Sequence, residues 1–182
     1  GVEVLGHEGD VALRSVLEVQ GAGDDPVVRV VPVHVGGQVV EEPGHDHPQL
    51  QTEYFTAALA DLQAKGEGAI IVMANLEIPE EAFHSGLRLN ALLKAELLES
   101  IFLKNAPLHD GAAIIIGDRI MHARCVLPIT TKKNLPGSLG LRHRAAMGVS
   151  EVAKVFVIVL SEESGQLSVA YNGNLKTGVN EE

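Results

Sequence analysis

Aromatic and basic residues are scarce in this chain. Its 182 residues include no tryptophan, two tyrosines and four phenylalanines, too few to supply the aromatic platforms on which single-stranded nucleic acids stack. The 14 lysines and arginines are outnumbered by 24 aspartates and glutamates, which gives a net charge of −10. A polyanion would be repelled unless the basic side chains were concentrated in one place. Composition therefore argues against nucleic-acid binding.

Cysteine and long apolar runs are scarce as well. The single cysteine, Cys125, excludes an internal disulfide and a cysteine-rich zinc site, and we expect it to be a small buried hydrophobe in an intracellular protein. The longest apolar runs, residues 111–116 and 155–160, are far shorter than the ~18 residues of a membrane-spanning helix. We expect a cytoplasmic chain that makes no membrane contact itself. Because it begins at Gly1, an anchor could still belong to the full-length protein.

The remainder is aliphatic and typical of a folded domain, with 46% hydrophobic and 21% charged residues. Residues 1–45 have strand-type patterning, and residues 41–48, with two prolines, resemble a connector. We therefore predict a β-rich N-terminal segment of unassigned role over residues 1–45 and a main domain over residues 46–182. The candidate strands of the first segment are residues 11–19, 27–33 and 35–40.

Helical and strand patterns alternate along the main domain. The expected helices are residues 50–62, a segment that starts at Pro79 and stops at Gly86, a segment with the apolar stripe Leu93, Leu97 and Ile101, and residues 139–153. The expected strands are residues 69–74, 112–116, 119–127, 155–160 and 167–171, the second and third forming a hairpin. This order predicts an α/β fold with a mixed central β-sheet flanked by helices.

Residues 107–112 (PLHDGA) place a histidine and a carboxylate at the start of an apolar strand. His109 and Asp110 could hold a metal ion or activate a hydroxyl, and Gly111 would let a ligand approach the backbone closely. An Asp-Gly turn that leads into a strand is the alternative interpretation, and the motif by itself does not separate the two.

Two arginines and a histidine follow Gly140 at an expected helix start. Cations are unfavourable at a helix N-terminus, so Arg142 and Arg144 there require an anion or nearby acids. Free backbone N–H groups and two guanidinium groups would together favour a phosphate chain. A solvated basic patch is the alternative.

A hydroxyl and two carboxylates, from Ser161, Glu162 and Glu163, follow the strand at residues 155–160. They lie at an edge of the expected sheet, where α/β proteins often bind ligands, and they would suit a hard divalent cation. A polar hairpin turn is the alternative.

With these motifs in order, residues 49–175 resemble the diadenylate cyclase domain, the family that condenses two ATP molecules into cyclic di-AMP. The resemblance rests on five segments: LLESIF at 97–102, PLHDGA at 107–112, CVLPI at 125–129, GLRHRAA at 140–146 and SEESG at 161–165.

The resemblance implies a role for ten residues. Asp110 would orient or deprotonate the 3′-hydroxyl of ATP. His109, Asp110 and Glu163 would hold Mg²⁺ or Mn²⁺. ATP would be bound by Gly111, Ala112, Leu127, Arg142, His143, Arg144 and Ser161, with Gly111 and Leu127 at the adenine.

The resemblance also implies a partner. Each subunit of the family holds one ATP, so a weak or transient homodimer must meet face to face, and larger homo-oligomers could also form. One residue departs from the family pattern: Leu141 replaces the usual threonine, whose hydroxyl can meet a phosphate. The alternative function is therefore a non-catalytic, nucleotide-binding sensor with the same fold.

Overall fold

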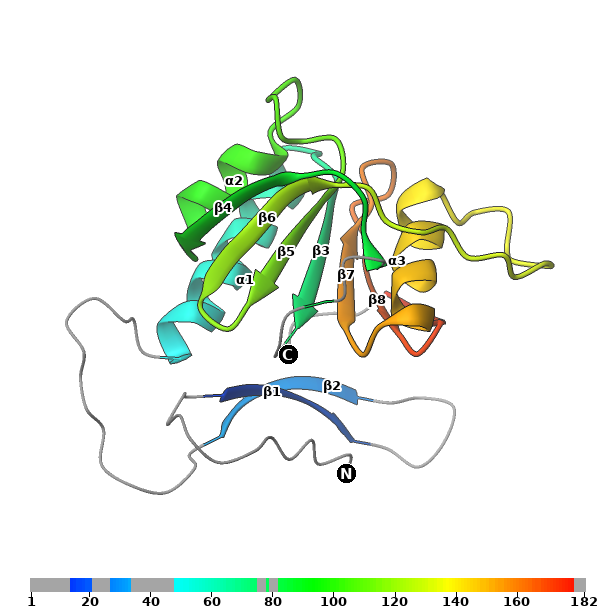
Figure 1. Ribbon diagram of the computed structural model, residues 1–182, viewed down its shortest axis with the longest axis horizontal. Helices are drawn as coiled ribbons and strands as arrows, with labels where there is room; N and C mark the ends of the chain where they lie inside the picture. Colours follow the sequence, from blue (N-terminus) through cyan, green and yellow to red (C-terminus); the bar gives the residue numbers. More distant parts are fainter. Residues whose placement is uncertain (1–13, 21–26, 34–47, 75–77, 79–81, 179–182) are drawn as a thin grey trace. The chain divides into compact units, whose positions relative to one another are not determined.

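Figure 1 shows the protein as a computed structural model, which describes residues 14–20, 27–33, 48–74, 78 and 82–178. The chain divides into two compact units, Gly1–Glu53 and Tyr54–Glu182. In the first, β1 (Arg14–Gln20) pairs antiparallel with β2 (Val27–Val33), from Arg14 opposite Val33 to Gln20 opposite Val27. The candidate strand at residues 35–40 and the segment 41–47 lie outside the described residues. The division of the chain at residues 45 and 46 stays a prediction.

The second unit is built on a seven-stranded sheet in the order β4-β6-β5-β3-β7-β8-β9. Strands β3 and β5 are parallel, and every other neighbouring pair is antiparallel, so the mixed sheet predicted from the sequence is confirmed. The strands are β3 (Ala69–Ala74), β4 (Leu87–Leu92), β5 (Ala112–Ile116), β6 (Arg119–Cys125), β7 (Phe156–Leu160), β8 (Leu167–Tyr171) and β9 (Asn174–Thr177).

Helices cover both faces of this sheet, as Figure 1 shows. On one face lie α1 (Pro48–Ala64) and α2 (Ala95–Phe102), and on the other lies α3 (Leu141–Val152). Successive side chains of a strand point to opposite faces, so the apolar run of β3 serves both. Ile71 packs with the core under α1 and α2, and Ile70 and Val72 pack with the core under α3.

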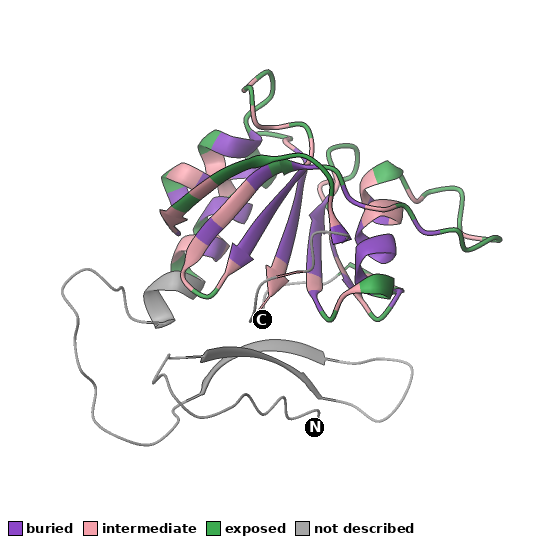
Figure 2. Ribbon diagram, in the orientation of Figure 1, coloured by how far each residue is buried: buried purple, intermediate pink, exposed green. Residues whose placement is uncertain are grey.

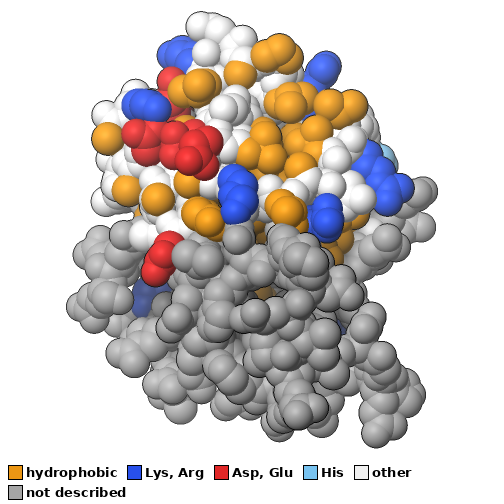
Figure 3. Space-filling model, turned by 90° about the vertical axis from the view of Figure 1, so that its left-hand side faces the viewer, with side chains coloured by type: hydrophobic (Ala, Val, Ile, Leu, Met, Phe, Trp, Pro, Cys, Tyr) orange, Lys and Arg blue, Asp and Glu red, His pale blue; other side chains and the backbone are white. Residues whose placement is uncertain are grey.

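The outer surface of α1 and α2 is charged. Lys65 bonds Asp61 one turn earlier in α1, and its Nζ lies 4.0 Å from Oε2 of Glu99 in α2. Figure 3, which views the molecule from the left of Figure 1, shows acidic and basic side chains beside apolar ones. Such exposed ion pairs add little to the stability of the fold. Most of the stability that α1 and α2 contribute therefore comes from their buried sides.

The expected helix from Pro79 to Gly86 is wrong over its described part. Only Ala82 is in a 3₁₀ conformation, and the backbone of His84 exchanges two hydrogen bonds with Val126, at 2.7 and 2.8 Å. A side chain at Gly86, whose φ is +116°, would come within 2.7 Å of Cys125 Sγ. The segment is extended because it packs against the end of β6, a contact that the local sequence does not reveal.

Strands β4 and β9 are absent from the sequence-based prediction, and both are edge strands. Most of their side chains are exposed or half-buried, so neither has the apolar run that marks β3 or β7. In β4 the register also shifts between Arg88 and Ala91, and Asn90 has a φ of +49°. An irregular, solvent-facing edge strand leaves little periodic signal.

Candidate functional site

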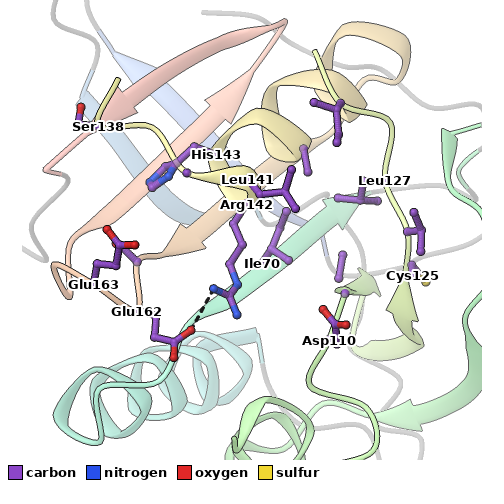
Figure 4. Close-up of a pocket in the computed structure, with 17 residues that line it drawn as sticks. Ile70, Asp110, Cys125, Leu127, Ser138, Leu141, Arg142, His143, Glu162 and Glu163 are labelled. Carbon is purple, nitrogen blue, oxygen red and sulfur yellow. Dashed lines mark hydrogen bonds and ion pairs between the residues drawn. The ribbon is translucent and has the colours of Figure 1, made fainter. Parts of the chain in front are cut away.

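A cavity of about 440 Å³ lies at the end of the sheet where β3 and β5 begin and β6 and β7 end (Figure 4). Its volume is within the usual range for small-molecule sites. Four of the five sequence segments named above meet there, together with the start of β3. The lining consists of residue 70, residues 110–112, residues 125–127 and 129, residues 138, 140–143 and 145, and residues 161–163.

One wall of the cavity is apolar. It is formed by Ile70 on β3, Ala112 at the start of β5 and Leu127, which is buried after β6. At the mouth stand three apolar side chains that remain largely exposed: Val126 at 56%, Ile129 at 51% and Leu141 at 68%. A flat apolar ring could be buried against this wall, since removing it from water is favourable.

The opposite wall is polar and is organised around Arg142 in the first turn of α3. Its Nη1 donates to Oε2 of Glu162 at 3.3 Å, and the other oxygen of Glu162 accepts from Nζ of Lys104, also at 3.3 Å (Figure 4). Hydrogen bonds and charge from Lys104, and then from Arg142, hold the pKa of Glu162 below its usual value. This wall therefore carries the guanidinium of Arg142 beside the carboxylate of Glu162, and Lys104, which does not line the cavity, bonds the same carboxylate.

His143 lies beside Arg142 and is only 8% exposed. Burial, and secondarily the charge of Arg142, lowers the pKa of its imidazole below 6.5, so the ring is neutral at pH 7. Within the described part of the chain its Nδ1 is buried and has no hydrogen-bond partner. A neutral ring offers one N–H donor and one acceptor, so it can hydrogen-bond a ligand without adding charge.

Asp110 is exposed at the far side of the cavity, as Figure 4 shows. The next residue, Gly111, has a φ of +125°, and a Cβ there would come within 2.9 Å of the backbone of Arg124 and Cys125. Glycine is therefore required by the close approach of β6 as well as by the backbone conformation. This turn places the Asp110 carboxylate at the mouth.

Of the ten residues predicted for the site, all but His109 and Arg144 line the cavity. His109 Nδ1 lies 2.7 Å from the carbonyl oxygen of Ala106, within its own loop. Arg144 donates from Nε to the carbonyl of Leu139 at 3.4 Å. The other eight, which the structure brings together, are Asp110, Gly111, Ala112, Leu127, Arg142, His143, Ser161 and Glu163.

The predicted metal ligands are not gathered in one place. Asp110 and Glu163 stand on different sides of Arg142 in Figure 4, and His109 is outside the cavity. Nowhere in the described ranges do three His, Cys, Asp or Glu side chains form a group that could hold a metal ion. Protein side chains alone therefore do not complete a metal site in this arrangement.

Several lining residues received no role from the sequence. Glu162 differs from these, because its motif suggested a ligand for a divalent cation, whereas its carboxylate accepts hydrogen bonds from Arg142 and Lys104 in the structure. No sequence motif marked Ile70 or Ser138, because only the folding of the chain brings these two residues to the cavity. Cys125 is 1% exposed, and burial raises the pKa of its thiol to about 12, so the expected role as a small buried hydrophobe is confirmed.

A family model described as DisA bacterial checkpoint controller nucleotide-binding matches residues 56–175. This range includes every residue of the cavity and about two thirds of the chain. The chain therefore belongs to the diadenylate cyclase domain family, as its motifs indicated.

Curated relatives of the chain are named as enzymes of the same family. The chain is 43% identical over 126 residues to diadenylate cyclase CdaS of Bacillus thuringiensis (69% of this chain, 63% of the relative). It is 38% identical over 140 residues to cyclic di-AMP synthase CdaA of Bacillus subtilis (77% and 51%). It is 36% identical over 172 residues to a diadenylate cyclase of Listeria monocytogenes (93% and 58%). The chain thus spans between about half and just under two thirds of these relatives.

Solved structures share the fold. A double mutant of DacA from Staphylococcus aureus matches with a TM-score of 0.69 and 34% identity over 72% of this chain and 88% of that one. A protein from Bacillus cereus described as a hypothetical membrane spanning protein matches with a TM-score of 0.67 and 42% identity (70% and 62%). None of the helices in the described part of this chain has the length and apolar character needed to cross a bilayer.

Proposed function

We propose that this chain is a diadenylate cyclase that converts two ATP molecules into cyclic di-AMP and two pyrophosphates. The observation that carries the proposal is a single cavity that combines an apolar wall, the guanidinium of Arg142 and the imidazole of His143 at the start of α3, and the carboxylate of Asp110. Relatives that share this domain at 36–43% identity are named diadenylate cyclase or cyclic di-AMP synthase.

ATP would lie across the cavity between its two walls. The adenine packs on Leu127 and the neighbouring apolar side chains, and the phosphates meet Arg142, His143 and Ser161. Gly140, the N-cap of α3, contributes no side-chain cap, so the first backbone N–H groups of the helix remain available to a phosphate. Arg144 supports the loop before α3 through the carbonyl of Leu139.

The chemistry is an in-line displacement at phosphorus. The 3′-oxygen of one ATP attacks the α-phosphorus of the other, a P–O bond forms, and the bond from that phosphorus to the pyrophosphate oxygen breaks. The proton of the 3′-hydroxyl passes to the carboxylate of Asp110 and from there to water. In the second step the 3′-oxygen of the other nucleotide attacks the remaining α-phosphorus, which closes the ring and releases the second pyrophosphate.

We also propose that Mg²⁺ or Mn²⁺ takes part. Mg²⁺ is commonly held by one or two carboxylates together with substrate phosphates, and the exposed carboxylate of Asp110 fits that mode. Glu163 and His109, which the sequence also suggested, would have to approach from elsewhere to join it. Such an ion neutralises triphosphate charge and eases the departure of pyrophosphate.

Two subunits must meet during turnover. Each cavity holds one nucleotide, whereas both ester bonds of the product join two nucleotides, so the mouths of two cavities have to face each other. We propose that this pair is a weak or transient homodimer, since both surfaces belong to chains with a net charge of −10.

The test is to incubate the protein with ATP and Mn²⁺ and to look for cyclic di-AMP by mass spectrometry across a wide dilution series. We expect product, and a rate that rises more steeply than linearly with enzyme concentration while the protein is dilute. ATP binding without product would instead identify a sensor, for which exposed Leu141 at the mouth is the supporting observation. A rate strictly proportional to enzyme in monomeric samples would contradict the paired mechanism.

A further inference from the structure

We infer that Gly68, Lys104 and Glu162 are positioning residues that hold the guanidinium of Arg142 where the phosphates of ATP bind. The inference rests on the proposed function and gives these residues a role toward Arg142 that neither the motifs nor the comparisons assign. Three contacts around Arg142 support it.

The first contact is the ion pair between Arg142 and Glu162. Nη1 of Arg142 lies 3.3 Å from Oε2 of Glu162, which belongs to the turn after β7 (Figure 4). Because a single nitrogen makes this bond, the guanidinium is oriented while other N–H groups can still reach a phosphate. The side chains of Arg142 and Glu162 are 35% and 37% exposed, so the pair stands at the surface of the cavity.

The second contact brings in Lys104, which follows α2 and comes from the opposite face of the sheet. Its Nζ lies 3.3 Å from Oε1 of Glu162. The carboxylate is thus held from two sides, and together the three side chains carry a net charge of +1. Without Lys104 the remaining pair would be neutral, and a triphosphate would lose part of the field that attracts it.

The third contact is steric. A Cβ at Gly68 would lie 2.9 Å from Cζ and Nη1 of Arg142 and 3.1 Å from Cβ of Glu162. The guanidinium therefore occupies the space that any side chain at position 68 would need. The guanidinium is the end of a flexible side chain. A methyl group added at position 68 would therefore displace the guanidinium and leave the backbone in place.

The experiment measures ATP binding by titration calorimetry in EDTA, where no turnover occurs. We expect Gly68→Ala and Glu162→Gln each to weaken ATP binding by about 5- to 20-fold. Each variant keeps Arg142 but misplaces it, so only part of the charge-assisted hydrogen bond between Arg142 and phosphate is lost. Lys104→Met should weaken ATP binding by about 2- to 5-fold, with a smaller effect at high salt, and Lys104→Arg should restore it.

Two control variants are available. Gly137→Ala adds a methyl group at a position where nothing lies within 4 Å, and Lys154→Met removes an exposed lysine beyond the far end of α3. Both should bind ATP like the wild type. Thermal unfolding of every variant checks that the fold is retained, and the exposed position of Lys104 makes its substitution harmless to folding.

A double-mutant cycle separates positioning from general damage. If Gly68 acts through Arg142, then Gly68→Ala should have no further effect once Arg142 is alanine. An equal loss of affinity in both backgrounds would overturn the inference. So would tighter binding of ATP by Glu162→Gln, because the carboxylate would then compete with phosphate.

The outcome for the wild type distinguishes the two proposals. A wild-type protein that binds ATP and makes cyclic di-AMP, with all three variants unaffected, would overturn this inference alone. A wild-type protein that binds no ATP would overturn both.

Discussion

The two faces of the seven-stranded sheet are covered to different extents. Under α1 and α2, the helices and strands form a continuous core that includes Leu98, Phe102 and Ile115, each at most 2% exposed. On the other face, α3 packs over β3, β7, β8 and β9 and leaves the ends of β5 and β6 to border the cavity. Figure 2 shows that most residues of the central strands are buried.

This difference separates residues that stabilise the fold from residues that line the cavity. Each face has a buried core that contributes to stability, but only the face under α3 also borders the cavity that we propose binds ATP. Substitutions in the core under α1 and α2 should therefore change the free energy of unfolding, and substitutions in the cavity should change ATP binding and turnover.

The largest effect is expected on the cavity face, at Asp110. Asp110→Asn should reduce cyclic di-AMP synthesis by about 10²- to 10⁴-fold, because the amide cannot take the 3′-proton. ATP binding in EDTA and the melting temperature should change little, since the side chain is exposed. Asp118→Asn, at the other end of the β5–β6 hairpin, is the control. Near-normal turnover of Asp110→Asn would remove the assigned role.

On the opposite face, Leu98→Ala should destabilise the protein by about 2 to 5 kcal/mol, because a fully buried side chain is replaced by a cavity. At a temperature where the variant remains folded, its turnover per folded molecule should match the wild type. Urea unfolding measures the first quantity and a product assay the second. Leu103→Ala, at a position 37% exposed, should cost much less. A large drop in turnover of folded Leu98→Ala would contradict the division between the faces.

At the polar wall, Arg142→Ala should weaken ATP binding by about 1.5 to 3 kcal/mol, the value of a charge-assisted hydrogen bond. The melting temperature should move little, because the ion pair with Glu162 is partly exposed. Arg119→Ala provides a matched control at the opposite end of the sheet, where Arg119 donates to the carbonyl of Asn90. An unchanged dissociation constant for ATP would contradict the assignment.

A smaller effect is expected at Leu141, which lines the cavity and is 68% exposed. Leu141→Thr should raise kcat/KM by about 2- to 10-fold, which corresponds to one neutral hydrogen bond of about 0.5 to 1.5 kcal/mol. Steady-state kinetics with ATP measures the gain. Equal or lower efficiency would show that another group or a water molecule already fills this role.

The smallest effect is a pH dependence of stability from His143. Its pKa in the folded protein is lowered from 6.5, mainly by burial, so the unfolded chain binds the proton more readily. Stability from this group is present above the unfolded pKa and declines as the pH falls below about 6.5. The free energy of unfolding of the wild type, measured with urea from pH 7.5 to 5.5, should fall more than that of His143→Gln. Parallel pH profiles would contradict this.

Central strands could be predicted because both of their sides are buried. The run AIIVMA of β3 and the run FVIVL of β7 are apolar throughout, which follows from helices on both faces. The edge strands β4 and β9 could not be predicted, because their solvent-facing side chains leave no apolar run in the sequence. The extended segment at His84 depends on hydrogen bonds to Val126, more than 40 residues later, and the sequence near Pro79 instead favours a helix.

The sequence by itself determined the family, the mixed sheet and the motifs that bear the chemistry, because these depend on residue types in a local order. Asp110, Arg142 and His143 could be chosen from their motifs alone. Only the tertiary structure decided which candidates share one cavity and which, such as His109, turn away from it. It also decided that Glu162 joins Arg142 to Lys104, 58 residues before it in the chain. Contacts of that kind arise when strand ends and helix ends converge, and no local pattern encodes their meeting.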